Sequence, residues 1–228
     1  MEPNYLPWAG FFNLIYNSDF FVFLDDVQFS KNSFGNRNQY LTKSGSAYIT
    51  LPVRKLKLEQ TYRDTFVVEE SKWRKKHLST IKSVYAKHPY FNEFFPKLET
   101  IITNTNYKNL ADINSNLIIH ICKYIGIEKN FVFSSELKKR SQRSERIYDI
   151  CQNLGCSVLL SAKGSRGYME EDLFFDRFDD LQVHFQNFKA REYCQKNSIK
   201  FVDKLSIIDV IFNLGPKLTH QYVSCEIT

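Results

Sequence analysis

Two adjacent carboxylates, Asp25 and Asp26, are the first side chains in this 228-residue sequence whose placement suggests chemistry. They directly follow residues 19–24, an apolar run that is rich in Phe and Val at its centre. This run predicts a strand that is buried on both faces. Ligands of open α/β sheets bind beyond the carboxyl ends of the strands. We therefore interpret the pair as candidate catalytic residues, with a turn or helix cap as the alternative role that aspartate commonly fills.

The loop that continues from this pair, residues 25–38, is dense in hydrogen-bonding side chains. Its amide and cationic groups alternate with Phe29 and Phe34, which favours a binding site over a merely solvated loop. The candidate substrate-binding residues of this loop are Gln28, Lys31, Asn36, Arg37 and Asn38.

A second polar segment, residues 161–168, follows another predicted strand at residues 157–161. It is a Gly-containing turn with two cations, which could present backbone N–H groups and positive charge to a phosphate or carboxylate, or be an ordinary polar loop. It contains neither a Walker pattern nor GxGxxG. Arg143 and Arg146 flank a predicted helix start at Ser144, and either could also hold an anion. The candidate binding residues here are Arg146, Lys163, Ser165, Arg166 and Tyr168.

The elements that must position these residues alternate between helix and strand. Hydrophobic periodicity and turn residues predict helices at 8–16, 72–86, 90–102, 110–125, 145–154 and 207–214, strands at 19–24, 131–133, 157–161 and 181–185, and a hairpin over 39–54. This order predicts one α/β domain over residues 1–228. We expect a mostly parallel, Rossmann-like sheet flanked by helices, with a small β-hairpin and an inserted helical segment at about 70–128.

Composition narrows the classes of function. The formal charge of +6 suits an acidic small ligand and is too small for a dedicated nucleic-acid binder, so we expect no nucleic-acid partner. No apolar run is long enough for a membrane span, and no signal peptide is recognisable, so we expect a cytoplasmic protein. The five cysteines lack metal or redox spacing, which predicts reduced thiols and no metal site. The 20 Phe and 13 Tyr indicate either stacking surfaces for a ligand or an AT-rich gene.

Several short motifs spread over nearly the whole chain resemble the WbqC-like proteins of bacterial surface-polysaccharide and O-antigen gene clusters. The opening block is the most specific part of this resemblance. The matching residues are Pro3-Asn4-Tyr5-Leu6-Pro7-Trp8, Gly10-Phe11-Phe12, Asp19, Leu24 to Lys31, Asn36-Arg37-Asn38, Leu51-Pro52-Val53, Ser144-Glu145-Arg146, Leu160-Ser161, Gly164, Gly167-Tyr168, Tyr193, Gln195, Phe201-Val202 and Leu205 to Gly215.

The resemblance implies a role in surface-polysaccharide assembly, and glycine transfer onto a nucleotide-linked amino sugar is the activity proposed for part of that family. On this basis we expect a nucleotide-sugar substrate, Asp25 or Asp26 as the base, and substrate contacts from Asn4, Tyr5 and Trp8. Lys31 and Arg37 would bind the donor or a nucleotide phosphate, and Lys163 and Arg166 the sugar-nucleotide diphosphate. The alternative is a non-catalytic sugar-nucleotide binding or scaffold protein of the same pathway.

The sequence departs from that family pattern at two places. Family members carry a short strand and a His-Gln pair before Pro-Asn, where this sequence has Met1 and Glu2. We therefore expect the family's first strand to be absent here, which would put activity in question if the His is catalytic. Phe34 stands where Trp is usual.

ATP is a candidate co-substrate on a fold-level analogy. The order of Pro-containing loop, helix, buried strand and polar Gln-Phe loop is similar to the start of nucleotidylyltransferases and pantothenate synthetase, which bind ATP at their first loop. The latter forms an amide through an acyl-adenylate. By this analogy, glycine would be activated directly by ATP.

Overall fold

A computed structural model describes residues 1–54, 57–138 and 143–225 of the chain. Within these ranges the protein is a mixed α/β structure of helices and short strands. The strands are β1 Phe20–Phe23, β2 Arg37–Thr42, β3 Gly45–Thr50, β4 Asn130–Phe133, β5 Val158–Ser161 and β6 Gln182–Phe185. The helices are α1 Ala9–Tyr16, α2 Trp73–Tyr85, α3 Phe91–Thr103, α4 Leu110–Tyr124, α5 Arg143–Asn153, α6 Arg166–Glu171, α7 Phe174–Arg177 and α8 Ile207–Val223.

The strands pair two by two. β1 pairs with β4 and β5 with β6, both in parallel, whereas β2 and β3 form the antiparallel hairpin that the sequence predicts. The expected α/β class and parallel pairing are therefore confirmed. The Rossmann-like description holds only in part, because each described sheet has two strands instead of forming one continuous sheet.

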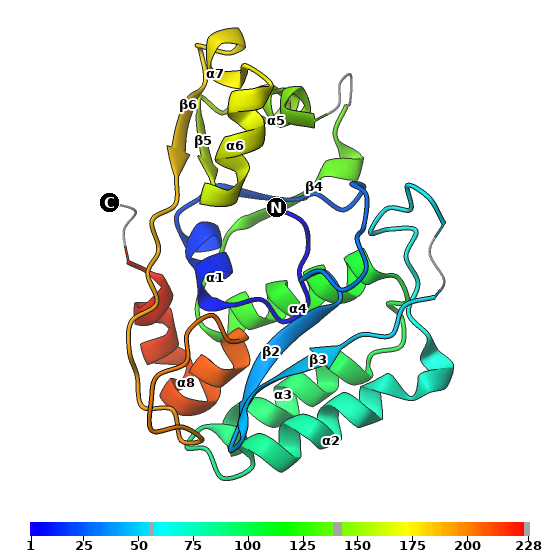
Figure 1. Ribbon diagram of the computed structural model, residues 1–228, viewed down its shortest axis with the longest axis vertical. Coiled ribbons are helices and arrows are strands. Elements are labelled where there is room, and N and C mark those ends of the chain that lie inside the picture. The colour runs from blue at the N-terminus through cyan, green and yellow to red at the C-terminus, as the bar shows by residue number, and fades with distance from the viewer. Residues whose placement is uncertain (55–56, 139–142, 226–228) are drawn as a thin grey trace.

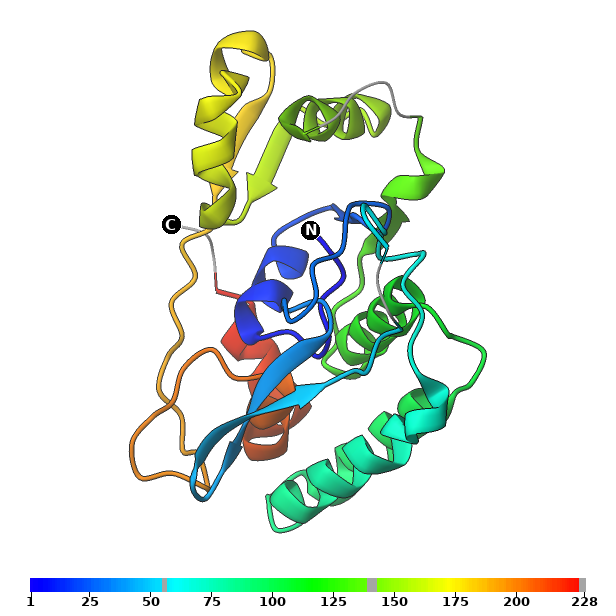
Figure 2. The ribbon, with the colours of Figure 1, turned by 45° about the vertical axis from the view of Figure 1, so that its right-hand side comes forward.

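The elements form two groups along the longest axis of the molecule. Figure 1 shows α5, α6, α7, β5 and β6 together at one end, and α2, α3 and α4 at the other with the hairpin across them. The N-terminus lies between these groups in both views (Figures 1 and 2). α1 lies beside α8, the last helix of the chain.

Most buried apolar side chains belong to one large core. It joins α1, β1, the hairpin, α2, α3, α4 and α8, so the predicted helical segment at 70–128 packs against the rest of the chain instead of standing apart. The largest of its fully buried side chains include Trp73, Tyr5, Tyr85, Phe11 and Phe12. A smaller core of Cys151, Met169, Phe174 and Leu181 lies within the group of α5, α6, α7, β5 and β6.

The last helix extends beyond its predicted end at residue 214. Gly215 interrupts it with a φ of 73° and ψ of 179°, after which Pro216 starts a second helical stretch up to Val223. Glycine is required at this break for two reasons. The backbone conformation is one that L side chains avoid, and a Cβ there would lie 2.4 Å from the Tyr90 ring. Proline is favourable at the first position of the resumed helix, because its fixed φ suits that position.

Candidate functional site

The carboxyl ends of β1 and β4 bring two polar segments together. The two strands run parallel and in register, from Phe20 opposite Asn130 to Phe23 opposite Phe133. The chain beyond β1 carries Asp25 and Asp26, and the chain beyond β4 begins with Ser134. The predicted carboxylate pair therefore lies at a strand edge of the kind where α/β proteins bind ligands.

The side chains that meet at this edge form what we call the aspartate cluster: Asp25, Asp26, Arg63, Ser134, Ser135 and Arg146. Asp25 is its centre and is almost completely buried, with 1% of its surface exposed. Its Oδ1 accepts hydrogen bonds from the Ser135 backbone N–H at 3.0 Å and the Ser134 hydroxyl at 3.1 Å. Its Oδ2 accepts from the Ser135 hydroxyl at 2.7 Å and the Arg63 guanidinium at 3.2 Å. Four donors thus converge on one carboxylate, which fixes its position and stabilises its charge.

Asp26 faces the same serine and a second guanidinium. The Ser134 hydroxyl is 2.5 Å from Asp26 Oδ1, so its single proton is shared between the two adjacent carboxylates. Arg146 donates from one Nη to Asp26 Oδ1 and lies 3.0 Å from the Ser134 hydroxyl. Burial lowers the pKa of Arg146, and the negative charge of Asp25 opposes that shift.

Among the residues that the structure describes, the two carboxylates face two guanidiniums, Arg63 and Arg146. The aspartate cluster is preorganised, since the groups are held by hydrogen bonds from three separate segments of the chain. Arg146 Nε is buried and has no acceptor among the described residues. An unmade hydrogen bond at a buried donor costs about 1–3 kcal/mol, so this N–H is a favourable contact for an oxygen of a ligand or water.

The structure gives several other predicted site residues contacts within the fold. The Asn36 amide donates to the Leu51 carbonyl at 3.0 Å, and the Asn38 amide donates to the carbonyls of Tyr5 and Leu6. Both asparagines are buried, and they tie the start of β2 and the residue before it to other segments of the chain. Arg37 stacks over the Tyr48 ring at 4.4 Å, on the hairpin. Gln28 and Lys31 are exposed.

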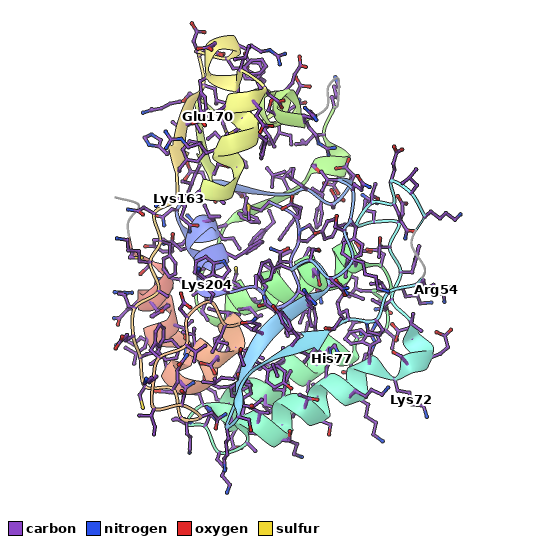
Figure 3. The ribbon with its side chains drawn as sticks, viewed as in Figure 1. Arg54, Lys72, His77, Lys163, Glu170 and Lys204 are labelled. Carbon is purple, nitrogen blue, oxygen red and sulfur yellow. The ribbon has the colours of Figure 1, made fainter. Side chains whose placement is uncertain are left out.

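The residues of the opening block support the core. The Tyr5 hydroxyl pairs with His77 Nδ1 at 2.8 Å, and the other ring nitrogen of His77 lies 3.1 Å from the Thr50 carbonyl on the hairpin (Figure 3). Trp8 precedes α1, covers Gly10 and meets the Phe188 ring edge-on at 5.5 Å. Asn4 is half-buried.

The cations of the second polar segment are engaged away from the aspartate cluster. Lys163 donates to the Asn187 side chain at 2.6 Å, and the Arg166 guanidinium pairs with Glu170 in the same helix. Figure 3 places Lys163 at the lower end of α6 and Glu170 further along it. Ser165 and Tyr168 face a groove instead, and the charge of Glu2 adds to the burial that raises the pKa of Tyr168.

That groove lies between β1 and β5 and has a volume of about 470 Å³. Its lining is mainly apolar and includes Leu14, Phe20, Ile150, Val158 and Leu160. Leu24 and Glu2 line one end, and Leu24 is adjacent to Asp25 in the chain. The groove therefore approaches the aspartate cluster along the edge of β1.

Sequence reasoning missed Arg63, Ser134 and Ser135. The two serines directly follow the predicted strand at 131–133, so the strand-end rule that selected Asp25 and Asp26 would have selected them also. Arg63 lies in a loop between Tyr62 and Asp64 with no pattern that distinguishes it from other exposed arginines.

Neither a metal cluster nor a membrane span is found in the described part of the chain. In the ranges 1–54, 57–138 and 143–225, His, Cys, Asp and Glu side chains form no group of three that could hold a metal ion. No helix in the same ranges is both long and apolar enough to cross a bilayer. All five cysteines are free thiols.

Comparison with known proteins gives one family and one curated relative. A sequence model described as the WbqC-like protein family matches residues 2–221. A Mycobacterium tuberculosis protein named "Uncharacterized protein Rv1507c" is 30% identical over 229 aligned residues, which cover 99% of this chain and 97% of the relative. No solved structure gives a significant match.

Proposed function

The chain belongs to the WbqC-like protein family, and on that premise we propose that it is an aminoacyl transferase of bacterial surface-polysaccharide (O-antigen) synthesis. The proposed reaction joins glycine through an amide bond to the amino group of a nucleotide-linked sugar. The observation that carries this proposal is the convergence of Asp25, Asp26, Arg63 and Arg146 at the carboxyl ends of two parallel strands.

The aspartates take different roles in this reaction. Asp25 accepts four hydrogen bonds and is the positioning residue that holds Ser134, Ser135 and Arg63 in place. Asp26, which pairs with Arg146 and the Ser134 hydroxyl, is the base that takes a proton from the sugar ammonium. The freed amine then attacks the acyl carbon of an activated glycine, the bond from that carbon to its leaving group breaks, and the nitrogen releases its extra proton to solvent as the amide forms.

Arg146 stabilises the negative charge that develops during this attack. Its Nη is paired with Asp26, while its Nε has no acceptor among the described residues and is available to an oxyanion or phosphate oxygen. The nucleotide diphosphate lies toward Ser165 and Tyr168 on the neighbouring strand end, with Lys163 and Arg166 as its cationic contacts. Lys31 and Arg37 stay as predicted contacts of the donor phosphate. Asn4 and Gln28 border the sugar.

For the activated glycine, we propose to test direct activation of the glycine carboxylate by ATP. In that route a glycine carboxylate oxygen attacks the α-phosphate of ATP, pyrophosphate leaves, and the resulting glycyl-adenylate releases AMP when the amine attacks. The purified protein would be incubated with glycine, ATP and a set of uridine- and thymidine-diphosphate amino sugars. Mass spectrometry should detect a sugar nucleotide heavier by one glycyl residue, together with AMP.

Two variants make this assay specific. Asp26→Asn should reduce product formation by about 10²-fold or more, because it removes the base and leaves the shape of the side chain nearly unchanged. Glu70→Gln is the matched control, since it changes a carboxylate that is exposed and pairs with the exposed Arg54, outside the proposed site. Equal rates in the Asp26→Asn variant and the unchanged protein would contradict the proposal.

A non-catalytic sugar-nucleotide binding or scaffold role is the second candidate. The saturated hydrogen bonding of Asp25 favours it, because a carboxylate with four donors is suited to fixing structure. Calorimetric titration distinguishes the two roles. Tight binding of a sugar nucleotide by the unchanged protein, without product from any glycine donor, would support binding over transfer.

A further inference from the structure

One side of α2 is cationic along the whole length of the helix. The opposite side packs into the core through the buried residues Trp73, His77, Leu78, Ile81 and Tyr85. The outer side and the two residues that flank the helix ends carry exposed lysines, which we call the lysine face: Lys72, Lys75, Lys76, Lys82 and Lys87. Figure 3 shows His77 on the side of α2 toward the hairpin and Lys72 on the outer side. Because Lys75 and Lys82 are two helical turns apart, they lie above one another on the same side.

No carboxylate within the helix offsets the charge of the lysine face. Residues 71–92 contain neither Asp nor Glu. The two glutamates just before them are paired with Arg74 and Arg54. The exposed charges of the neighbouring α3 are Glu93, Lys97 and Glu99, of which Glu93 accepts a hydrogen bond from α4. The lysine face is therefore a local excess of positive charge, which attracts an acidic partner.

The shape of the lysine face favours an extended partner. Its lysines span residues 72–87, about 22 Å at the rise of an α-helix. Because the outside of a helix is convex, their ammonium groups diverge and do not converge on one small anion. Arginine and aromatic side chains, which nucleic-acid-binding surfaces use for phosphates and bases, are absent from the exposed residues of α2. The lysine face thus suits a continuous layer of negative charge that approaches from one side.

A short turn, residues 196–200, lies against the C-terminal end of α2. The Lys196 ammonium donates to the Lys87 carbonyl, and the Asn197 amide donates to the Leu41 carbonyl on the hairpin at 3.1 Å. The hairpin turn lies beside the same end of α2 in both views (Figures 1 and 2). The turn at 196–200 is therefore fixed next to the lysine face by contacts with two other elements.

This turn presents an aliphatic side chain to solvent. Ile199 is fully exposed, and the exposed Lys200 follows it. The turn is closed by its own hydrogen bonds, from the Ser198 N–H to the Gln195 carbonyl at 3.0 Å and from the Ser198 hydroxyl to the Lys200 carbonyl at 2.7 Å. A large aliphatic group held out in water and flanked by lysines gains free energy when it enters the boundary between lipid headgroups and acyl chains.

We propose that the lysine face and the turn at 196–200 dock the protein onto an anionic lipid bilayer. In this arrangement α2 lies along the membrane surface and Ile199 inserts among the lipid headgroups. The inference goes beyond the proposed function, because it assigns a membrane-docking surface and does not depend on which reaction Asp26 performs. Figures 1 and 2 show β4 and α2 on opposite sides of α4, so docking leaves the aspartate cluster open to solvent.

Two weak attractions add in this docking. Each lysine near an anionic bilayer contributes a modest electrostatic attraction that acts within about 10 Å at about 0.1 M salt. Burial of Ile199 adds an apolar contribution that salt does not screen. Since reversible membrane binding commonly needs two such signals, loss of either one should weaken it strongly.

Sedimentation with lipid vesicles tests the proposal on the full chain. The vesicles consist of phosphatidylcholine alone or of phosphatidylcholine with about one third phosphatidylglycerol. At about 0.1 M salt the protein should partition at least about tenfold more strongly onto the anionic vesicles, and about 0.5 M salt should reduce that partition about tenfold. Equal partition onto both kinds of vesicle would overturn the proposal.

A triple variant removes the centre of the lysine face. Lys75→Gln, Lys76→Gln and Lys82→Gln together should weaken partition onto anionic vesicles by about 30-fold or more, because three attractive charges are lost. The corresponding triple change to arginine keeps the charges and should stay within about threefold of the unchanged protein. Loss of binding in the arginine variant as well would show that charge is not the cause, and would overturn the proposal.

A second triple variant controls for net charge. Lys123→Gln, Lys189→Gln and Lys217→Gln remove three exposed lysines from α4, the chain after β6 and α8. This variant has the same net charge as the first glutamine variant but an intact lysine face, so its partition should fall less than about threefold. A similar loss in both glutamine variants would overturn the assignment to α2.

Two tryptophan variants locate the inserted residue. The fluorescence of Ile199→Trp should shift to shorter wavelength on anionic vesicles and be quenched by brominated lipid, because the indole then lies at the bilayer interface. Leu58→Trp is the matched control, since Leu58 is also an exposed aliphatic residue, at 91%, but lies in the loop before α2. Its fluorescence should stay unchanged. Quenching of both tryptophans, or of neither, would overturn the docking arrangement.

A nucleic acid is the competing extended partner. The same variants would be mixed with a short DNA duplex in an electrophoretic mobility assay, in which we expect no complex at about 0.1 M salt. A DNA complex that the lysine-face glutamine variant loses, with no partition of the unchanged protein onto vesicles, would overturn the proposal in favour of nucleic acid.

Discussion

Asp25 and Ser135 are joined by two hydrogen bonds, one from the serine backbone N–H at 3.0 Å and one from its hydroxyl at 2.7 Å. The residues are 110 positions apart in the sequence and belong to the ends of two parallel strands. This paired contact locks the end of β1 to the end of β4. The aspartate cluster is therefore held in place by the ends of both strands and not by a single loop.

Removing the Asp25 carboxylate should destabilise the whole protein. Asp25→Ala leaves the backbone N–H and the hydroxyl of Ser135 without their carboxylate acceptor beside the buried end of β1, which should lower the free energy of unfolding by about 2 kcal/mol or more. Urea denaturation measures this change. Glu170→Ala removes an exposed carboxylate and should stay within about 0.5 kcal/mol. A loss no larger than that control would show that Asp25 is not the centre of the cluster.

Changing Arg146 should separate activity from stability. Arg146→Lys keeps the positive charge but cannot contact Asp26 and Ser134 while also offering a second donor, so product formation should fall by about 10²-fold. The exposed Arg54→Lys serves for comparison, and we expect less than about a threefold change there, since Arg54 pairs with the exposed Glu70 and has no role in the proposed reaction. Product formation and urea denaturation would be measured for both variants. Similar activities in the two variants would remove Arg146 from the proposed mechanism.

His77 should make the protein less stable in mild acid. Burial lowers the pKa of His77 to about 4, below the 6.5 of an exposed histidine. Between these values the unfolded chain binds a proton that the folded chain does not, so stability falls as the pH drops from 6.5 to 4. This one group contributes about 3 kcal/mol to the loss.

The His77→Phe variant isolates that contribution. Its free energy of unfolding should be lower at pH 7, because Tyr5 loses a hydrogen-bond partner, but should depend less steeply on pH between 6.5 and 4. Urea denaturation at several pH values gives both curves. Parallel curves for the two proteins would contradict a neutral, buried His77.

Gly10 is expected to be irreplaceable while Trp8 is present. A Cβ at Gly10 would lie 2.2 Å from the Trp8 ring, so Gly10→Ala should cost about 1–3 kcal/mol of unfolding free energy by overpacking. In a Trp8→Ala background the clash is gone, and the added methyl should be neutral or favourable in the helix. A thermodynamic cycle of the four proteins measures this coupling, and equal costs in both backgrounds would disprove it.

Local patterns in the sequence are sufficient to identify much of this structure. The buried run at 19–24 and the Asp-Asp pair after it predict both β1 and one half of the candidate site, because a strand interior and a polar strand end have distinct compositions. The hairpin and the helices at 72–86, 90–102 and 110–125 are present within a few residues of their predicted bounds. Helix periodicity is a short-range property, so no knowledge of distant contacts is needed for it.

The roles of individual polar residues cannot be assigned in the same way. Asn36 and Asn38 have the composition of ligand contacts, yet their amides bind the carbonyls of Leu51, Tyr5 and Leu6. An amide that holds a loop and an amide that holds a ligand are the same chemical group, and only the position of the partner distinguishes them.

The sequence by itself determined which segments are helices and strands, where the carboxylate pair lies and which family the chain resembles. Only the tertiary structure decided that β1 pairs with β4, that Ser135 and Arg63 reach Asp25, and that β1 and β5 face each other across a groove next to Met1. The physical reason is the distance along the sequence over which each interaction acts. Helix and strand preferences arise from neighbouring residues, whereas strand order depends on backbone hydrogen bonds and burial between segments more than 100 residues apart, such as Asp25 and Ser135.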